Sequence, residues 1–107
     1  MLGKTVTVTV DRPLGTYHPE HPDIFYTVNY GYLSGVLAPD GEEQDAYILG
    51  VDEPVCEFTG KVIAVIHRID DVEDKLVVAP DGTTFSREEI GRQVAFQERF
   101  FRTEIIL

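Results

Sequence analysis

The 107-residue sequence has little cysteine, few basic residues and no long apolar runs. Cys56 is the single cysteine, so no intrachain disulfide can form. No apolar stretch approaches the roughly 20 residues that a membrane-spanning helix needs. Nine Lys and Arg residues stand against 19 Asp and Glu residues, for a formal net charge of −10. Because nucleic-acid backbones are bound by clusters of basic side chains, this balance argues against a DNA or RNA partner and favours bound cations.

The rest of the composition is that of a folded domain. Hydrophobic residues make up 43% of the chain, with five Tyr and six Phe among them, which is enough to build a core. We therefore expect residues 1–107 to form a single domain. The first residues lead directly into an alternating segment and show no signal peptide, so we expect a cytoplasmic protein.

An acidic turn at residues 40–45 has the most distinctive chemistry in the sequence. Pro39 followed by Asp40-Gly41 predicts a tight reversal between two extended segments. The carboxylates that follow so closely, at positions 40, 42, 43 and 45, repel one another unless a cation lies between them. Mg²⁺ takes oxygen ligands of this kind. Two interpretations are open: a metal site, or the solvated tip of a hairpin.

Alternation and β-branched or aromatic residues predict several strands. In residues 4–10 threonines alternate with valines, which predicts a strand with the valines inward, and residues 11–15 should end it. Further strands are expected at residues 24–28 running into 29–33, 46–51, 61–67 and 76–79, with a linking turn at 55–60. Gly31 lies between two tyrosines and indicates a bulge or a close approach of backbone or ligand. Its neighbour Tyr30 is either a hydroxyl donor in a site or a core aromatic.

A second acidic turn, residues 70–74, is followed directly by Lys75. Because both acidic turns connect strands, a barrel could bring them together at one end. Lys75 is then placed either to meet a phosphate oxygen or to neutralise its neighbours. His18 and His21, in a proline-containing loop over residues 16–23, are a weak signal for a metal and fit surface histidines better.

The C-terminal region predicts one helix. Ser86 and Glu89 form a capping-box pattern at its start. An apolar stripe should pack this helix across the barrel: Ile90, Val94, Phe96, Phe100 and Phe101. The charged residues should lie mostly outside: Arg87, Arg92, Glu98 and Arg99. Residues 105–107 form an apolar tail that could dock on the domain or on another subunit. The predicted fold is mainly β (α+β): a small, closed or partly open OB-like β-barrel with one C-terminal α-helix.

These motifs also resemble a known family. The run Asn29-Tyr30-Gly31-Tyr32, followed eight residues on by Asp40-Gly41-Glu42-x-x-Asp45, resembles the soluble family I inorganic pyrophosphatases. Their signature is Asp-Gly-Asp-Pro-x-Asp after Asn-Tyr-Gly-Tyr at the same distance. The likeness continues through Asp70 and residues 73–80, which look like the family's second acidic loop, its lysine and the strand after it.

The resemblance implies a diphosphatase that uses Mg²⁺, or Mn²⁺ in its place, to hydrolyse pyrophosphate through a metal-activated water. By position, Asp40, Asp45 and Glu73 would hold the first metal, and Asp45 would be shared with a second. Asp70 with Glu73 would hold the metal that arrives with substrate. Glu42 would be the general base. The phosphate and substrate contacts would come from Tyr30, Lys75 and Asp11, and a homo-oligomer is expected because family members usually assemble.

The sequence also departs from the family. The Lys-x-Glu hairpin expected after the first strand is absent, His18 stands in place of an arginine, and Glu104-Ile105 replaces a terminal Tyr-Lys pair. Most of the basic side chains that would bind the two phosphates are therefore missing. Arg12, which adjoins Asp11, and more remotely Arg68 and Arg102, are the candidates to replace it.

Three functions from different classes remain open. The first is a compact metal-dependent diphosphatase acting on pyrophosphate or on an organic diphosphate. The second is a relative that binds metal and a phosphorylated small molecule without turnover. The third is a structural barrel or nucleic-acid module, against which the net charge of −10 argues.

Overall fold

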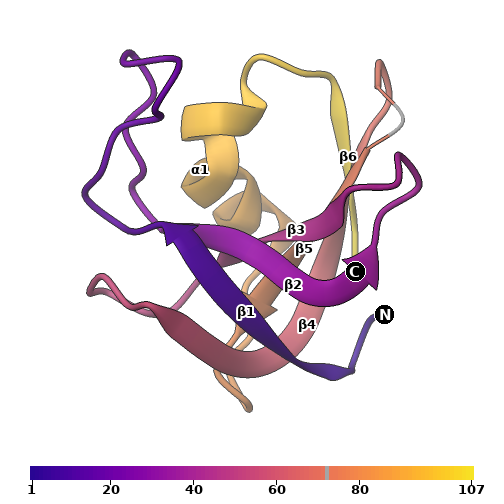
Figure 1. Cartoon of the computed structure of the whole chain (residues 1–107). Helices are drawn as coiled ribbons and strands as arrows, with labels where there is room; N and C mark the ends of the chain where they lie inside the picture. Colours follow the sequence, from indigo (N-terminus) through magenta and orange to yellow (C-terminus); the bar gives the residue numbers. More distant parts are fainter. Residues whose placement is uncertain (72) are drawn as a thin grey trace.

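The computed structural model describes residues 1–71 and 73–107. It shows a closed β-barrel with one helix packed against it (Figure 1). Val72, in the second acidic turn, lies outside the described residues. The elements are, in order, β1 (Thr5–Arg12), β2 (Asn29–Leu37), β3 (Glu43–Ile48), β4 (Glu57–Arg68), β5 (Asp74–Ala79), α1 (Arg87–Glu98) and β6 (Thr103–Ile106).

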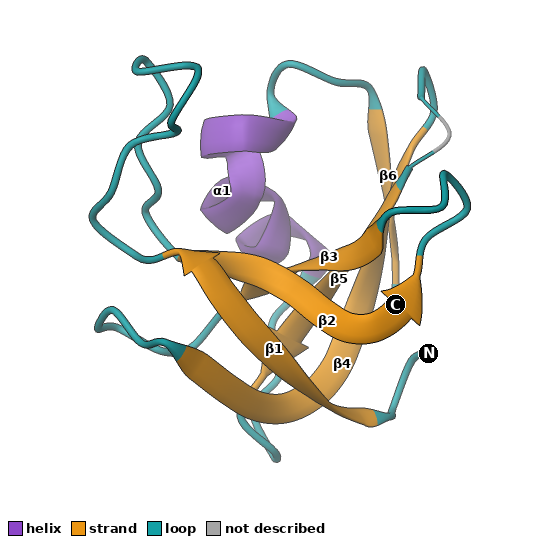
Figure 2. Cartoon of the chain, viewed as in Figure 1, coloured by secondary structure: helices purple, strands orange, loops and turns teal. Residues whose placement is uncertain are grey.

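Five strands form the ring of the barrel. They run in the order β1-β2-β3-β5-β4, and β1 pairs with the first half of β4 to close the ring, while β6 pairs with the last residues of β4, on the edge away from β5. Neighbouring strands are antiparallel except β3 and β5, which run parallel. Figure 2 shows the strands wrapped around one another with α1 beside the barrel. The predicted fold, an OB-like barrel with a C-terminal helix, is confirmed.

The core has two layers. One apolar cluster lies inside the barrel and draws on each of its five strands: Val8, Leu33, Ala46, Ile48, Val62, Leu76 and Val78. The other lies between the sheet and α1: Ile24, Tyr26, Val28, Tyr30, Tyr47, Leu49, Ala64, Ile66, Val77, Ile90 and Val94. Strands β3 and β5 contribute to both clusters, so both of their faces are buried. This explains why their apolar residues, 46–48 and 76–79, form continuous runs instead of alternating with polar ones.

Gly31 marks both a bulge and a close approach, as predicted. The pairing of β1 with β2 shifts register between Val10 and Arg12, opposite Gly31 and Tyr30, which leaves Asp11 as the extra residue. A Cβ built on Gly31 would lie 1.9 Å from the carbonyl oxygen of Thr9. Only glycine fits where the two backbones approach so closely.

Several strand predictions need correction. The strand predicted at residues 46–51 is β3, Glu43–Ile48, because Gln44 and Asp45 already pair with β2. β1 continues to Arg12, past the predicted end at residue 10, because the bulge absorbs Asp11. Residues 24–28 form only a single bridge, between Tyr17 and Phe25, because their backbone groups bond to the preceding loop. Residues 57–60 are strand and not a turn, because they pair with β1 and close the barrel.

The helix begins as predicted and ends early. Ser86 caps α1 in a complete capping box with Glu89, but the helix ends at Glu98, so Phe100 and Phe101 lie beyond it. The buried positions are Ile90, Val94, Gln97 and Glu98, which contradicts the expectation that Glu98 faces outside. The apolar tail docks on its own domain as β6, antiparallel to β4. Within residues 1–71 and 73–107, no helix has the length and apolarity needed to cross a membrane.

Candidate active site

The β2–β3 connection shapes the first acidic turn. Gly41 adopts a φ of 86°, which suits glycine, and the amide of Glu42 donates to the Asp40 Oδ1 atom at 3.0 Å. The amide of Ala38 donates to the Glu42 carbonyl across the loop at 2.7 Å. The predicted tight turn between two extended segments is confirmed at residues 39–42, and it places Asp40 and Glu42 at the tip of a hairpin. The other two carboxylates of the predicted turn, Glu43 and Asp45, lie in β3, where Asp45 pairs with Tyr32 of β2.

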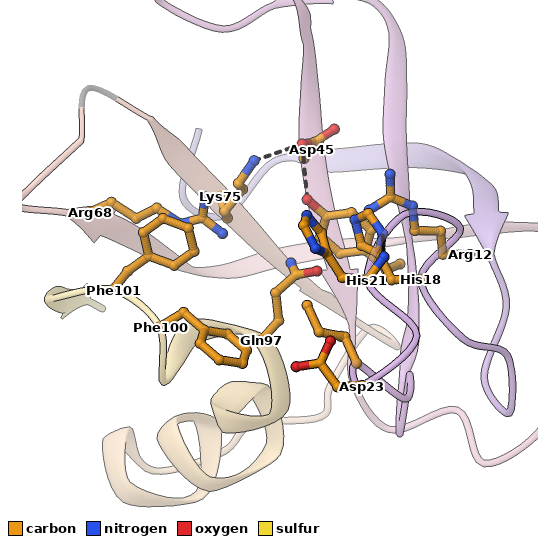
Figure 3. Close-up of a pocket in the computed structure, with 12 residues that line it drawn as sticks. Arg12, His18, His21, Asp23, Asp45, Arg68, Lys75, Gln97, Phe100 and Phe101 are labelled. Carbon is orange, nitrogen blue, oxygen red and sulfur yellow. Dashed lines mark hydrogen bonds and ion pairs between the residues drawn. The ribbon is translucent and has the colours of Figure 1, made fainter.

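The parallel pairing of β3 with β5 brings Asp45 beside Lys75. Ala46 pairs with Leu76, so the residues just before them are neighbours across the sheet. The Lys75 ammonium donates to Asp45 Oδ2 at 2.6 Å and to Glu73 Oε2 at 3.0 Å (Figure 3 shows the contact with Asp45). Lys75 is only 4% exposed, so these two carboxylates balance a charge that is largely withdrawn from water.

Tyr30 is both a core aromatic and a donor to the site. Its ring packs edge-on against Tyr47, while its hydroxyl donates to Asp45 Oδ2 at 2.9 Å. Burial, and then the charge of Asp45, raise the pKa of Tyr30 well above its ordinary range. The phenol therefore stays protonated and keeps donating. The interpretation of Tyr30 as a core aromatic is confirmed, and its role in a functional site stays a prediction.

The two acidic turns meet on one cavity of about 470 Å³. The amide of Glu42, and next a hydrogen bond shared with the Glu73 carboxyl, lower the pKa of Asp40. Asp40 of the first turn and Glu73 of the second line the same cavity. The residues lining the cavity are Asp11, Tyr32, Ala38, Asp40, Glu42, Glu43, Asp45, Glu73, Asp74 and Lys75. Seven of these ten side chains are acids, which repel one another unless cations reduce the charge.

Most of the site residues singled out in the sequence therefore gather in one place. Asp40, Glu42, Asp45, Glu73 and Lys75 line the acidic cavity together with Asp11. Tyr30 reaches it through Asp45, and Arg12 lines a second cavity next to it.

Asp70 and Arg102 are placed differently. Both carboxylate oxygens of Asp70 accept from the backbone amide of Arg102, at 3.2 Å each, and Asp70 does not line the acidic cavity. Arg102 lines neither this cavity nor the second one.

The donor chemistry of the acidic cavity fits a hard divalent cation. Carboxylate oxygens from both turns line it, and these are the ligands that Mg²⁺ and Mn²⁺ prefer. In the described part of the chain, however, no group of three or more acids, histidines or cysteines is already arranged to hold a metal ion. The Lys75 ammonium instead bridges Asp45 and Glu73. The carboxylates of the acidic cavity are thus of the type that binds a divalent metal. To bind one, their side chains would have to move closer together.

A buried ion-pair network connects Glu73 of the acidic cavity to Glu98 of α1 through Arg68. Arg68 donates through Nε and Nη2 to both oxygens of Glu98, at 3.0 and 2.7 Å, and through Nη1 to Glu73 at 3.0 Å. Glu98 also accepts from the Tyr47 hydroxyl at 2.5 Å. Burial opposes the charge of Arg68, but the bonds to Glu98 outweigh it and raise its pKa. Glu73, a predicted metal ligand, is therefore held between Arg68 and Lys75.

The sequence held signals for this network. The alternation of Val62, Ala64 and Ile66 along β4 continues to Arg68, which indicates that Arg68 also points inward. Glu98 lies four residues after Val94 and eight after Ile90, on the same buried stripe of the helix.

Comparisons with known proteins bear on the fold. No protein-family model matches the sequence, and no curated protein matches it significantly. Solved structures do match. An inorganic pyrophosphatase from Ehrlichia chaffeensis superposes with a TM-score of 0.73 at 16% identity, over 97% of this chain and 85% of that one. One from Coxiella burnetii gives 0.66 at 16% identity, over 98% and 85%.

A third solved structure, from Helicobacter pylori, has the same character. This inorganic pyrophosphatase gives a TM-score of 0.65 at 16% identity, over 95% of this chain and 82% of that one. At such identities the likeness concerns the path of the backbone. The barrel and terminal helix of this chain therefore have the fold of the solved inorganic pyrophosphatases.

Proposed function

We propose that this chain hydrolyses inorganic pyrophosphate to two phosphates with the help of Mg²⁺. The observation that carries the proposal is the meeting of two acidic turns and Lys75 on one cavity. That arrangement offers oxygen ligands for cations and an ammonium for phosphate in the same place. The fold shared with solved inorganic pyrophosphatases supports the same activity.

Each residue has a role in the proposed reaction. Lys75, Tyr30 and Arg12 bind phosphoryl oxygens, and Asp11 contacts the substrate from the wall of the acidic cavity. Glu42, at the exposed tip of the turn, accepts a proton from the attacking water. The water oxygen bonds to one phosphorus, the bridging P–O bond breaks, and the second phosphate leaves. Asp40, Asp45 and Glu73 would hold Mg²⁺, which would neutralise phosphate charge and acidify water. Asp70 as a further ligand and assembly into a homo-oligomer stay predictions.

The first test is phosphate release from pyrophosphate by the wild type and by Asp45→Asn. The substitution removes the charge that Lys75 and Tyr30 both contact and preserves the size of the side chain. We expect kcat/KM to fall by about 100-fold or more, the scale on which catalytic electrostatic contacts act. Asp52→Asn is the matched control, because Asp52 is exposed and lines neither cavity. Activity that survives Asp45→Asn unchanged would contradict the proposal.

Metal binding gives an independent prediction. Mg²⁺ should raise the melting temperature of the wild type, because an ion that binds only the folded state stabilises it. At about 100 times Kd the gain is about 2.7 kcal/mol. The gain should shrink in Glu73→Gln and persist in Asp52→Asn. Differential scanning fluorimetry in EDTA and in graded MgCl₂ measures it, and equal shifts in both variants would refute the cation site.

One observation favours a second function, binding of metal and a phosphorylated small molecule without turnover. Every guanidinium nitrogen of Arg68 donates to Glu98 or Glu73, and the Lys75 ammonium lies between Glu73 and Asp45. The two most buried cations of the site are thus directed toward protein acids and not toward the open cavity. Stabilisation by Mg²⁺ together with no phosphate release by the wild type would establish this second function over the first.

A further inference from the structure

A second cavity of about 440 Å³ adjoins the acidic one. The two share Asp45 and Lys75, so the Lys75 ammonium lies at their junction. The volume falls in the range of about 300–1,000 Å³ that is common for cavities binding organic ligands. The acidic cavity already offers room for cations and a small anion. The second cavity therefore adds space that inorganic pyrophosphate alone does not require.

One side of this second cavity carries hydrogen-bond donors for phosphate. Arg12 donates through Nη1 to the Tyr26 hydroxyl at 2.9 Å, and within residues 1–71 and 73–107 it forms no ion pair with a carboxylate. A guanidinium has five N–H donors, so others remain for a ligand. The Nδ1 atom of His18 accepts from the amides of Glu20 and His21, which leaves Nε2 of the neutral ring as a donor.

The second cavity also has an apolar part. Ile24, Phe100 and Phe101 contribute it, and Figure 3 shows both phenylalanines, with Arg68 and Gln97 near them, across the cavity from Arg12, His18 and His21. Phe101 covers the Arg68 guanidinium at 3.7 Å from its ring centroid, while Phe100 is 51% exposed. An exposed aromatic ring at a cavity wall can gain free energy by packing on an apolar ligand group. Pyrophosphate has no such group.

We propose that the site takes an organic diphosphate, a diphosphate ester whose apolar or aromatic group lies against Ile24, Phe100 and Phe101. The diphosphate would lie between Arg12 and Lys75, with its terminal phosphorus at the acidic cavity. This inference rests on the proposed function, because it uses the same phosphoanhydride chemistry. Water adds to the terminal phosphorus, the bridging P–O bond breaks, and the organic monophosphate leaves while phosphate is released.

The test compares organic diphosphates with pyrophosphate in the presence of Mg²⁺. Adenosine diphosphate supplies a planar aromatic group and geranyl diphosphate an apolar chain. Phosphate release is measured for both and for pyrophosphate with the wild type, Phe100→Ala and the control Ile106→Ala. Ile106 is exposed on β6 and lines neither cavity. We expect Phe100→Ala to lower kcat/KM about tenfold for at least one organic substrate and less than twofold for pyrophosphate.

A binding assay separates this inference from the proposed function. Calorimetry compares α,β-methylene adenosine diphosphate with methylenediphosphonate, which carries no organic group. Tighter binding of the nucleotide analogue that Phe100→Ala abolishes supports the inference, even where pyrophosphate is not turned over. Hydrolysis of pyrophosphate, combined with no binding or turnover of either organic diphosphate, overturns the inference and leaves the proposed function standing. Equal effects of Phe100→Ala and Ile106→Ala also overturn it.

Discussion

Replacing Glu98 by alanine is expected to lower the free energy of unfolding by about 3–5 kcal/mol, because it leaves a buried arginine without its principal partner. Arg68 is 5% exposed and Glu98 4%, and two hydrogen bonds join them. The Tyr47 hydroxyl would lose an acceptor as well. Arg68 would keep only its Nη1 bond to Glu73, and a buried charge that has lost two of its three hydrogen bonds cannot recover its hydration energy, so the cost falls on the folded state. Urea unfolding followed by circular dichroism measures it.

Two further variants test whether the loss of the Arg68–Glu98 pair is the cause. Glu104→Ala removes an exposed acid from β6 and should change stability by less than about 0.5 kcal/mol. The double variant Arg68→Met/Glu98→Leu removes both charges and should recover much of the loss, because apolar pairs of similar volume replace buried ion pairs well. A loss below about 1 kcal/mol for Glu98→Ala would refute the role given to this pair.

Gly31→Ala is the second large effect. The added methyl carbon would lie 1.9 Å from the Thr9 carbonyl oxygen and 2.9 Å from the Val10 Cα atom, both of them backbone atoms. Relief requires strands β1 and β2 to separate where they pair. We expect stability to fall by roughly 3 kcal/mol, and the melting temperature by more than about 10 °C.

Gly91→Ala is the matched control, since the chemical change is the same. Gly91 lies in α1, and its new methyl carbon would meet only Ile105 Cδ1 at 3.7 Å, an ordinary contact. Alanine in a helix is favoured over glycine by roughly 0.5–1 kcal/mol, so this variant should be slightly more stable than the wild type. Thermal melts that shift in the same direction for both variants would contradict the argument from close approach.

The sequence predicted what depends on local chemistry. The capping box of α1, the Asp40-Gly41 turn and the barrel strands are patterns carried by a few adjacent residues, and the structure has them. The errors arise where partners are distant. Residues 57–60 resemble a turn until β1 lies beside them, and residues 24–28 resemble a strand although their bonds go to a loop. Side-chain type does not specify which backbone groups will be available for pairing.

The site follows the same division. The two acidic turns and Lys75 were identified from their spacing, and the structure gathers them on one cavity. Glu98 was placed outside because charged residues are usually exposed, a general rule that its partner Arg68 overrides. The cavity lined by Phe100 and Phe101 was missed because it exists only once α1 ends at Glu98 and the loop holding His18 lies opposite.

The parallel pairing of β3 with β5 also constrains the order in which the chain can fold. Strands β1 to β3 form the first part of the sheet. Its two outer strands pair with later ones, β1 with β4 and β3 with β5, so both edges stay unpaired until β4 and β5 are available. Contacts between such distant segments make folding slow, typically milliseconds to seconds. During synthesis, β1 to β3 would therefore emerge with Ala46 and Ile48 uncovered, which makes the nascent chain most prone to aggregation before β5 is made.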